Sequence, residues 1–227
     1  MLRLFQTMDK KYSAVIFDMD GTLTDSMWVW NKADEVFCEK HGVTLSEQNK
    51  KDIHAATFVN AVKYLIELCH SNLSYEEVVD DMVKTATYEY INNVTLVNGA
   101  KEFILFLKSQ SIPIYLLTSC TRDMAFAALK ARGIYDYFNG FFFVDKPYQV
   151  KTKPTVFLET LETIGKTADE CVIFEDMPFA LKSAKSLGIY SVFVSATAAD
   201  SAAITNGSKY SDLTITDYYD EALKKLF

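Results

Sequence analysis

The sequence lacks paired cysteines. Its four cysteines, Cys38, Cys69, Cys120 and Cys171, lie far apart, and no two have the Cys-x-x-Cys spacing of zinc and redox motifs. We therefore expect all four to be buried, unreactive thiols, because free cysteine is among the most buried residue types. Reduced thiols are typical of a cytoplasmic protein.

Positive charge and long apolar runs are also scarce. Lysine and arginine total 23 against 30 aspartates and glutamates, which gives a net charge of −7 and a pI of about 5.0. This acidity argues against binding to nucleic-acid backbones or through a polybasic patch to membranes. No apolar run approaches the length of a membrane span, and the start "MLRLFQTMDKK" is too broken for a secretory signal. We expect a cytoplasmic protein with no nucleic-acid or membrane partner.

The residues that are present are sufficient for a large core. About half of the 227 residues are apolar and 14% are aromatic, enough for one or two domains. Residues 13–17 are typical of a buried parallel strand. From about residue 98, expected strands alternate with helices of ten to fifteen residues, ending in a helix over 217–227. This alternation predicts an α/β fold with a Rossmann-like parallel sheet covered on both faces.

A long helical stretch interrupts this pattern after the first strand. It includes one helical region from Ser46 to about Cys69 and another that starts at Ser74, with Glu77 completing a capping box. About seventy residues are too many for an ordinary crossover connection. We therefore predict an inserted, all-helical cap domain over residues 27–95, with the core formed by residues 1–26 and 96–227.

Polar side chains follow several of the expected strands. In an open parallel α/β sheet, ligands bind beyond the carboxyl ends of the strands. The candidate site residues are Asp18 and Asp20 after the first strand, Thr118 and Ser119 after the second, Glu175 and Asp176 after the fourth, and Lys151 or Lys153 before the helix that opens at Pro154. We expect these side chains to converge on one edge of the sheet.

The carboxylates predict a cation site. Asp18, Asp20, Glu175 and Asp176 would repel one another in a shared crevice unless a cation lay between them. Oxygen ligands without histidine or cysteine favour a hard ion, Mg²⁺ above others. Thr118, Ser119 and a lysine could bind the oxygens of a phosphate that shares this metal.

Two aspartates one residue apart suggest a division of labour. Strand alternation places Asp18 and Asp20 on the same side, with Met19 pointing away. One carboxylate could attack phosphorus and form an aspartyl-phosphate, which divides one difficult displacement into two. The other could protonate the leaving oxygen and later deprotonate the attacking water.

These motifs resemble one known family. "DMDGT" at 18–22, followed in order by Thr118, Lys151 and "ED" at 175–176, is similar to the haloacid dehalogenase superfamily, in the branch with a helical cap that holds β-phosphoglucomutase-like and phosphoglycolate-phosphatase-like enzymes. No GxGxxG follows the first strand, as a Rossmann dehydrogenase would require.

The resemblance implies a role for each candidate. Asp18 would be the nucleophile and a Mg²⁺ ligand, and Asp20 the general acid and base, with its backbone carbonyl on the metal. Asp176 would bind the metal with Glu175 beside it as ligand or water-holder, and Thr118 would bind the phosphoryl group. The family's lysine usually stands three residues before a helix-opening proline, which indicates Lys151, with Lys153 as the alternative.

Two features bear on the reaction. Residues 27–95 contain no arginine, although a phosphomutase must hold a second phosphate in its cap. Asp20 argues against haloalkanoate dehalogenation, which does not need the second aspartate. We expect a Mg²⁺-dependent phosphatase of a small phosphorylated metabolite such as a sugar phosphate, with no obligate protein partner. The alternatives are a phosphomutase and a non-catalytic binding protein on the same scaffold.

Overall fold

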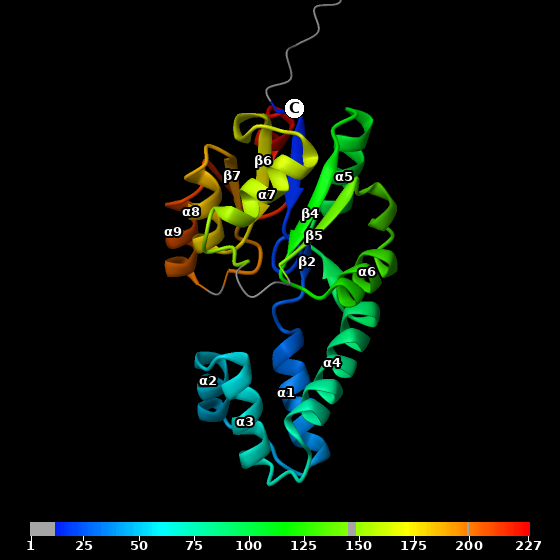
Figure 1. Cartoon of the computed structure of the whole chain (residues 1–227), viewed down its shortest axis with the longest axis vertical. Coiled ribbons are helices and arrows are strands. Elements are labelled where there is room, and N and C mark those ends of the chain that lie inside the picture. Colours follow the sequence, from blue (N-terminus) through cyan, green and yellow to red (C-terminus); the bar gives the residue numbers. More distant parts are fainter. Residues whose placement is uncertain (1–11, 145–148, 199) are drawn as a thin grey trace, which may run out of the picture. The chain divides into compact units, whose positions relative to one another are not determined.

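The protein folds as two compact units. The computed structural model describes residues 12–144, 149–198 and 200–227. Among these residues, the core unit comprises those up to Asp25 and from Thr95 onward, and the helical unit comprises Ser26–Val94 (Figure 1). The helical unit therefore begins and ends one residue earlier than the insertion expected at 27–95.

A parallel sheet forms the centre of the core unit. Its six strands lie in the order β5-β4-β1-β6-β7-β8, and every neighbouring pair is parallel. The strands are β1 (Ala14–Phe17), β4 (Ile114–Thr118), β5 (Gly140–Phe143), β6 (Cys171–Glu175), β7 (Tyr190–Val194) and β8 (Leu213–Ile215). β1 lies inside the sheet and is fully buried, as its short apolar run indicates. The structure confirms the predicted Rossmann-like fold class.

Helices supply apolar side chains to the sheet. They are α5 (Ala100–Ser109), α6 (Arg122–Ala131), α7 (Thr155–Ile164), α8 (Pro178–Lys185), α9 (Ser201–Ser208) and α10 (Glu221–Lys224), with short 3₁₀ turns at Tyr135–Tyr137 and Ala168–Glu170. Ile16 of β1 belongs to a buried cluster with residues of α7 and α8. The next residue, Phe17, contacts Phe103 of α5 with ring centroids 6.3 Å apart. Successive side chains of a strand point to opposite faces, so β1 contributes to both layers of the core.

The last helix is shorter than the sequence indicates. We predicted a helix over 217–227, but α10 begins at Glu221. Asp220 caps it by accepting a hydrogen bond from the backbone N–H of Ala222 at 2.8 Å. Tyr218 therefore lies before the helix, where its backbone N–H donates to the carbonyl of Asn98 at 2.9 Å.

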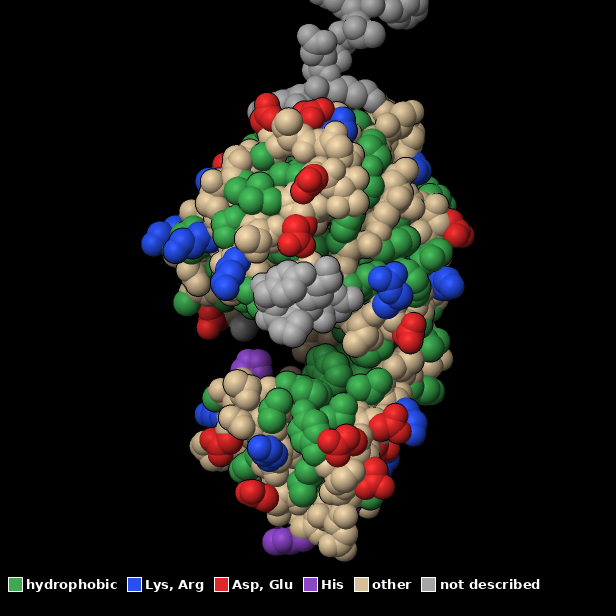
Figure 2. All heavy atoms as spheres, viewed as in Figure 1, with side chains coloured by type: hydrophobic (Ala, Val, Ile, Leu, Met, Phe, Trp, Pro, Cys, Tyr) green, Lys and Arg blue, Asp and Glu red, His purple; other side chains and the backbone are tan. Residues whose placement is uncertain are grey.

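The helical unit contains α1 (Val29–Lys40), α2 (Glu47–Ala55), α3 (Phe58–Leu68) and α4 (Tyr75–Asn92). The continuous helical region expected from Ser46 to Cys69 is broken, because Ala56 and Thr57 are extended and Thr57 caps α3. The capping box of Ser74 and Glu77 forms as predicted. Figure 2 shows acidic and basic side chains interspersed on the visible surface of this unit.

The chain leaves and re-enters the core unit through two short strands. β2 (Thr24–Asp25) and β3 (Thr95–Leu96) pair antiparallel to each other. The segment between them, the helical unit, thus begins and ends at one small two-stranded sheet. Among the described residues, no helix is both long and apolar enough to cross a membrane.

Candidate active site

The candidate residues lie where three neighbouring strands end. Asp18 follows β1, Thr118 is the last residue of β4, and Glu175 is the last residue of β6. β1 pairs with both of the other strands, and Phe17 is in register with Leu116 on one side and Phe174 on the other. The carboxyl edge of the sheet therefore brings these side chains together.

Lys151 connects two of the carboxylates. Its ammonium donates to Oδ1 of Asp18 and, at 2.8 Å, to Oε2 of Glu175. Lys151 is only 7% exposed, whereas Lys153 is exposed to solvent. Of the two lysines that the sequence left open, Lys151 is the one within the carboxylate group.

Three carboxylates form a group that could hold a metal ion. Oxygens of Asp18, Glu175 and Asp176 lie within 4.8 Å of one another. Oδ1 of Asp176 is buried without a hydrogen-bond partner among the described residues. In contrast, Glu175 accepts hydrogen bonds from Lys151 and from the backbone N–H groups of Asp176 and Met177, at 3.2 and 3.1 Å. The unsatisfied oxygen and the oxygen-only donor set fit a hard divalent cation such as Mg²⁺.

Burial and mutual repulsion govern the ionisation of these groups. Burial, followed by the charge of Glu175, raises the pKa of Asp18 to about 8 and that of Asp176 to about 10, although Lys151 opposes both shifts. Burial alone would lower the pKa of Lys151, but the carboxylates of Asp18 and Glu175 outweigh it and raise that pKa. A bound divalent cation would favour the ionised carboxylates and reverse the shifts of the two aspartates.

Asp20 occupies a tight loop after β1. The carbonyl of Met19 accepts hydrogen bonds from the N–H groups of Leu23 and Thr24, both at 2.9 Å, and the N–H of Gly21 donates to the carbonyl of Thr24 at 2.8 Å. The Asp20 carboxylate does not belong to the three-carboxylate group. Its charge does contribute to the raised pKa of Asp18, although less than burial and the charge of Glu175. The loop thus keeps Asp20 beside Asp18 but outside the three-carboxylate group.

Gly21 is required by this geometry. Its φ of +77° is unfavourable for residues with a side chain. A Cβ atom here would lie 2.3 Å from Oδ2 of Asp176. The glycine therefore lets the backbone of the Asp20 loop pass directly against a candidate metal ligand.

The predicted phosphate-binding residues differ in exposure. Thr118 is fully buried, and its Oγ1 accepts a hydrogen bond from the backbone N–H of Cys120 at 3.0 Å. Ser119 is exposed. Both precede α6, whose first N–H groups lack partners within the helix and suit an anion.

Sequence reasoning missed Tyr218. Its buried hydroxyl donates to the carbonyl of Thr22, in the loop that carries Asp20, at 3.2 Å. The residue stands in a stretch with helical periodicity, 196 positions away from Thr22. No local pattern in the sequence indicates such a contact.

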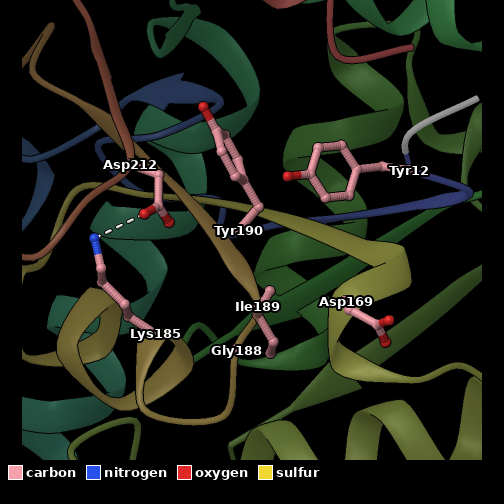
Figure 3. A pocket seen from close by; sticks show the side chains of 7 residues that line it. All are labelled: Tyr12, Asp169, Lys185, Gly188, Ile189, Tyr190 and Asp212. Carbon is pink, nitrogen blue, oxygen red and sulfur yellow. Dashed lines mark hydrogen bonds and ion pairs between the residues drawn. The ribbon is translucent and has the colours of Figure 1, made fainter.

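A separate hollow of about 450 Å³ lies at the other end of the sheet. It is lined by Tyr12, Asp169, Lys185, Gly188, Ile189, Tyr190 and Asp212 (Figure 3). Tyr12 precedes β1, Asp169 precedes β6, and Tyr190 begins β7. Lys185 is already paired with Asp212 at 2.8 Å. This hollow is at the amino ends of the strands and is not part of the carboxylate site.

Comparison with known proteins gives consistent results. Residues 12–188 match the haloacid dehalogenase-like hydrolase family. A phosphorylated carbohydrates phosphatase from Thermotoga maritima is 27% identical over 183 residues, 79% of this chain and 83% of the relative. Fructose-1-phosphate phosphatase YqaB from Escherichia coli is 24% identical, over 82% of this chain and 98% of the relative. A crystal structure from Thermotoga maritima that carries a β-phosphoglucomutase assignment superposes with a TM-score of 0.84 at 24% identity, covering 95% of this chain and 100% of the other.

Proposed function

The chain belongs to the haloacid dehalogenase-like hydrolase family, and from this premise we propose that it is a Mg²⁺-dependent phosphatase of small phosphorylated carbohydrates. The observation that carries the proposal is the buried contact of Lys151 with Asp18 and Glu175, next to the unpaired Asp176 oxygen. A lysine, a nucleophilic carboxylate and a cation site around one point suit the transfer of an anionic phosphoryl group.

Asp18 is the nucleophile in this proposal. Its carboxylate oxygen forms a bond to phosphorus while the bond from phosphorus to the leaving oxygen breaks, which gives an aspartyl-phosphate. Asp20 donates a proton to the leaving oxygen. It then takes a proton from the water that attacks the aspartyl-phosphate, and Asp18 and inorganic phosphate are released.

The other residues hold the phosphoryl group and the metal. Lys151 neutralises charge on the phosphoryl oxygens, and Thr118, with the first N–H groups of α6, donates to them. Asp18 and Asp176 would hold Mg²⁺, together with the Asp20 carbonyl that the family resemblance implies. The ion would shield the negative charges of carboxylate and phosphate from one another. Glu175, whose oxygens already accept three hydrogen bonds, orients Lys151 and the turn after β6.

The substrate class rests on the relatives. The two phosphatases described above are named for phosphorylated carbohydrates and for fructose 1-phosphate. Both cover most of this chain at modest identity, so the shared feature is the class of substrate and not one particular sugar. We propose a sugar phosphate as substrate.

A phosphomutase is the second candidate, because the similar structure from Thermotoga maritima carries that assignment. A mutase keeps the phosphoryl group in the site and returns it to the other end of the substrate, so it must grip two phosphates. Residues 27–95 contain no arginine for this purpose. The lack of a bidentate phosphate ligand there favours hydrolysis.

The experiment is a Mg²⁺-dependent phosphate-release assay on a panel of hexose, pentose and hexitol phosphates, with Asp18→Asn as the inactive control. We expect phosphate release that is abolished by EDTA, restored by Mg²⁺ and absent in the variant. Conversion of a hexose 1-phosphate to its isomer with a bisphosphate activator and without phosphate release would instead establish the mutase. No turnover and no Mg²⁺ binding would leave the non-catalytic alternative.

A further inference from the structure

Three successive carbonyls in the Asp20 loop are held by donors from distant parts of the chain. The carbonyl of Gly21 accepts from Oγ1 of Thr197 at 3.3 Å, and that of Thr22 accepts from the Tyr218 hydroxyl at 3.2 Å. The carbonyl of Leu23 accepts from the backbone N–H of Val97 at 2.9 Å. The loop that carries Asp20 is therefore fixed from outside as well as by its own turn.

Tyr218 is held rigidly in place. Its side chain is 4% exposed, and its ring lies 6.2 Å from that of Phe17 and 5.6 Å from those of Phe103 and Phe174. Its backbone also packs against Gly99, where an added Cβ would lie 3.1 Å from the Tyr218 carbonyl carbon. A ring with so little freedom fixes the position of its hydroxyl, and with it the Thr22 carbonyl.

Thr197 follows β7 and also reaches this loop. A Cβ on Gly21 would lie 3.0 Å from Oγ1 of Thr197 and 2.3 Å from Oδ2 of Asp176. The threonine hydroxyl and the aspartate thus approach the same α-carbon. Movement of the Gly21 backbone would change both the direction of Asp20 and the space beside Asp176.

We propose that Tyr218 and Thr197 are positioning residues that align Asp20 with Asp18 and Asp176. The inference rests on the proposed phosphatase function and adds to it residues beyond position 188, outside the part of the chain that matches the family. Each hydroxyl donates its hydrogen to a backbone carbonyl of the loop. Thr197 fixes the carbonyl of Gly21, one residue after Asp20, and Tyr218 fixes that of Thr22, two residues after it.

The consequence is a selective effect on the chemical step. Phosphate is held in the proposal by Lys151 and Thr118, which lie on other segments of the chain, so loosening the Asp20 loop leaves substrate binding intact. Misplacing a general acid by about 1 Å can cost on the order of 100-fold in rate. Loss of either hydroxyl therefore lowers kcat and leaves KM nearly unchanged.

The test uses two variants, each with a matched control. Tyr218→Phe removes one hydroxyl, and Tyr219→Phe makes the same change at a neighbour that is 61% exposed. Thr197→Val removes the second hydroxyl at constant shape, and Thr197→Ser retains it. Each protein is assayed for kcat and KM with Mg²⁺ and an active sugar phosphate, and by hydrogen–deuterium exchange over residues 18–25.

We expect Tyr218→Phe and Thr197→Val to lower kcat about 10- to 100-fold, the usual effect of losing a supporting hydrogen bond, with KM within about twofold. Exchange over residues 18–25 should accelerate in both, whereas Tyr219→Phe and Thr197→Ser should match the unmodified protein. Unchanged exchange or unchanged kcat in both hydroxyl-deleted variants would overturn the proposal, as would an equal loss in Thr197→Ser.

The exchange measurement needs no substrate, so it tests the positioning role of Tyr218 and Thr197 separately from the proposed phosphatase function. If the unmodified protein releases no phosphate, the proposed function fails, but faster exchange in the hydroxyl-deleted variants still establishes that these residues fix the loop. If phosphate is released and exchange is unaffected, the function stands and the positioning role fails.

Discussion

The ammonium of Lys151 lies 2.8 Å from Oε2 of Glu175, and both side chains are almost completely buried. Lys151 also donates to Asp18, so one cation satisfies two carboxylates that would otherwise repel. Removing one partner of a buried ion pair costs more than the pair itself contributes, because the other charge remains buried without compensation. Lys151 therefore serves both the stability of the site and its proposed chemistry.

Replacing Lys151 should impair stability and activity together. We expect Lys151→Met to lower kcat at least 100-fold and the free energy of unfolding by about 3–5 kcal/mol. Lys153→Met is the matched control, since Lys153 is exposed, and should change stability by less than about 0.5 kcal/mol. Urea denaturation and steady-state kinetics measure both effects. Equal behaviour of the two variants would contradict the assignment of Lys151.

Gly21→Ala should abolish activity because its Cβ would overlap the Asp176 carboxylate. Gly165→Ala provides a control with comparable backbone strain, as φ is +66° and no atom lies within 4 Å of the added Cβ. Gly165→Ala should lose about 1 kcal/mol of stability from the left-handed conformation, and Gly21→Ala should lose more, because its Cβ must also displace the Asp176 carboxylate. Only Gly21→Ala should lose activity, by at least about 100-fold. A fully active Gly21→Ala would show that the loop does not pack as described.

Magnesium should stabilise the protein most at neutral and alkaline pH. In the metal-free protein, the pKa of Asp18 is raised from 3.8 to about 8 and that of Asp176 to about 10, mainly by burial. Because folding raises these two pKa values, the stability that the aspartates contribute is fully present below about pH 4. It is lost as the pH rises through the raised pKa values. At pH 8, Mg²⁺ at 100 times its Kd should raise the free energy of unfolding by about 2.7 kcal/mol. Asp176→Asn should remove most of that gain. Thermal unfolding with and without Mg²⁺ measures it, and an undiminished gain in the variant would contradict the site.

Asp34 should make the helical unit sensitive to pH. It is buried on α1, and burial, followed by the charge of Glu35, raises the pKa of Asp34 from 3.8 to about 7. Its contribution to stability should therefore be lost as the pH rises from about 4 to 7. Asp34→Asn should stabilise the protein by about 1–3 kcal/mol at pH 8 and have little effect at pH 4. Asp52→Asn, at an exposed position of α2, is the control for urea denaturation at both pH values. Equal effects at pH 4 and pH 8 would contradict this account.

The sequence predicted the features that depend on local pattern and strand order. Alternation of strands and helices after residue 98 indicated the parallel sheet, and polar residues at strand ends indicated which side chains would meet. A parallel sheet brings its carboxyl ends together whatever the details of packing, so Asp18, Glu175 and Asp176 could be grouped from their spacing.

Other features depend on contacts that no local pattern encodes. The break between α2 and α3 has a single cap, Thr57, in an otherwise helical sequence. Cys38 and Cys69 are 31 positions apart, yet their sulfur atoms lie 3.4 Å from each other. The hydrogen bond from Tyr218 to Thr22 joins opposite ends of the chain. Such contacts follow from tertiary packing, which overrides the helical periodicity of the last segment.

The central claim is that Asp18 carries the phosphoryl group. The most direct measurement is borohydride trapping during turnover of a sugar phosphate with Mg²⁺, followed by peptide mass spectrometry. The account predicts reduction of residue 18 to homoserine, only when both substrate and Mg²⁺ are present. Steady phosphate release with an unmodified Asp18 peptide would contradict it.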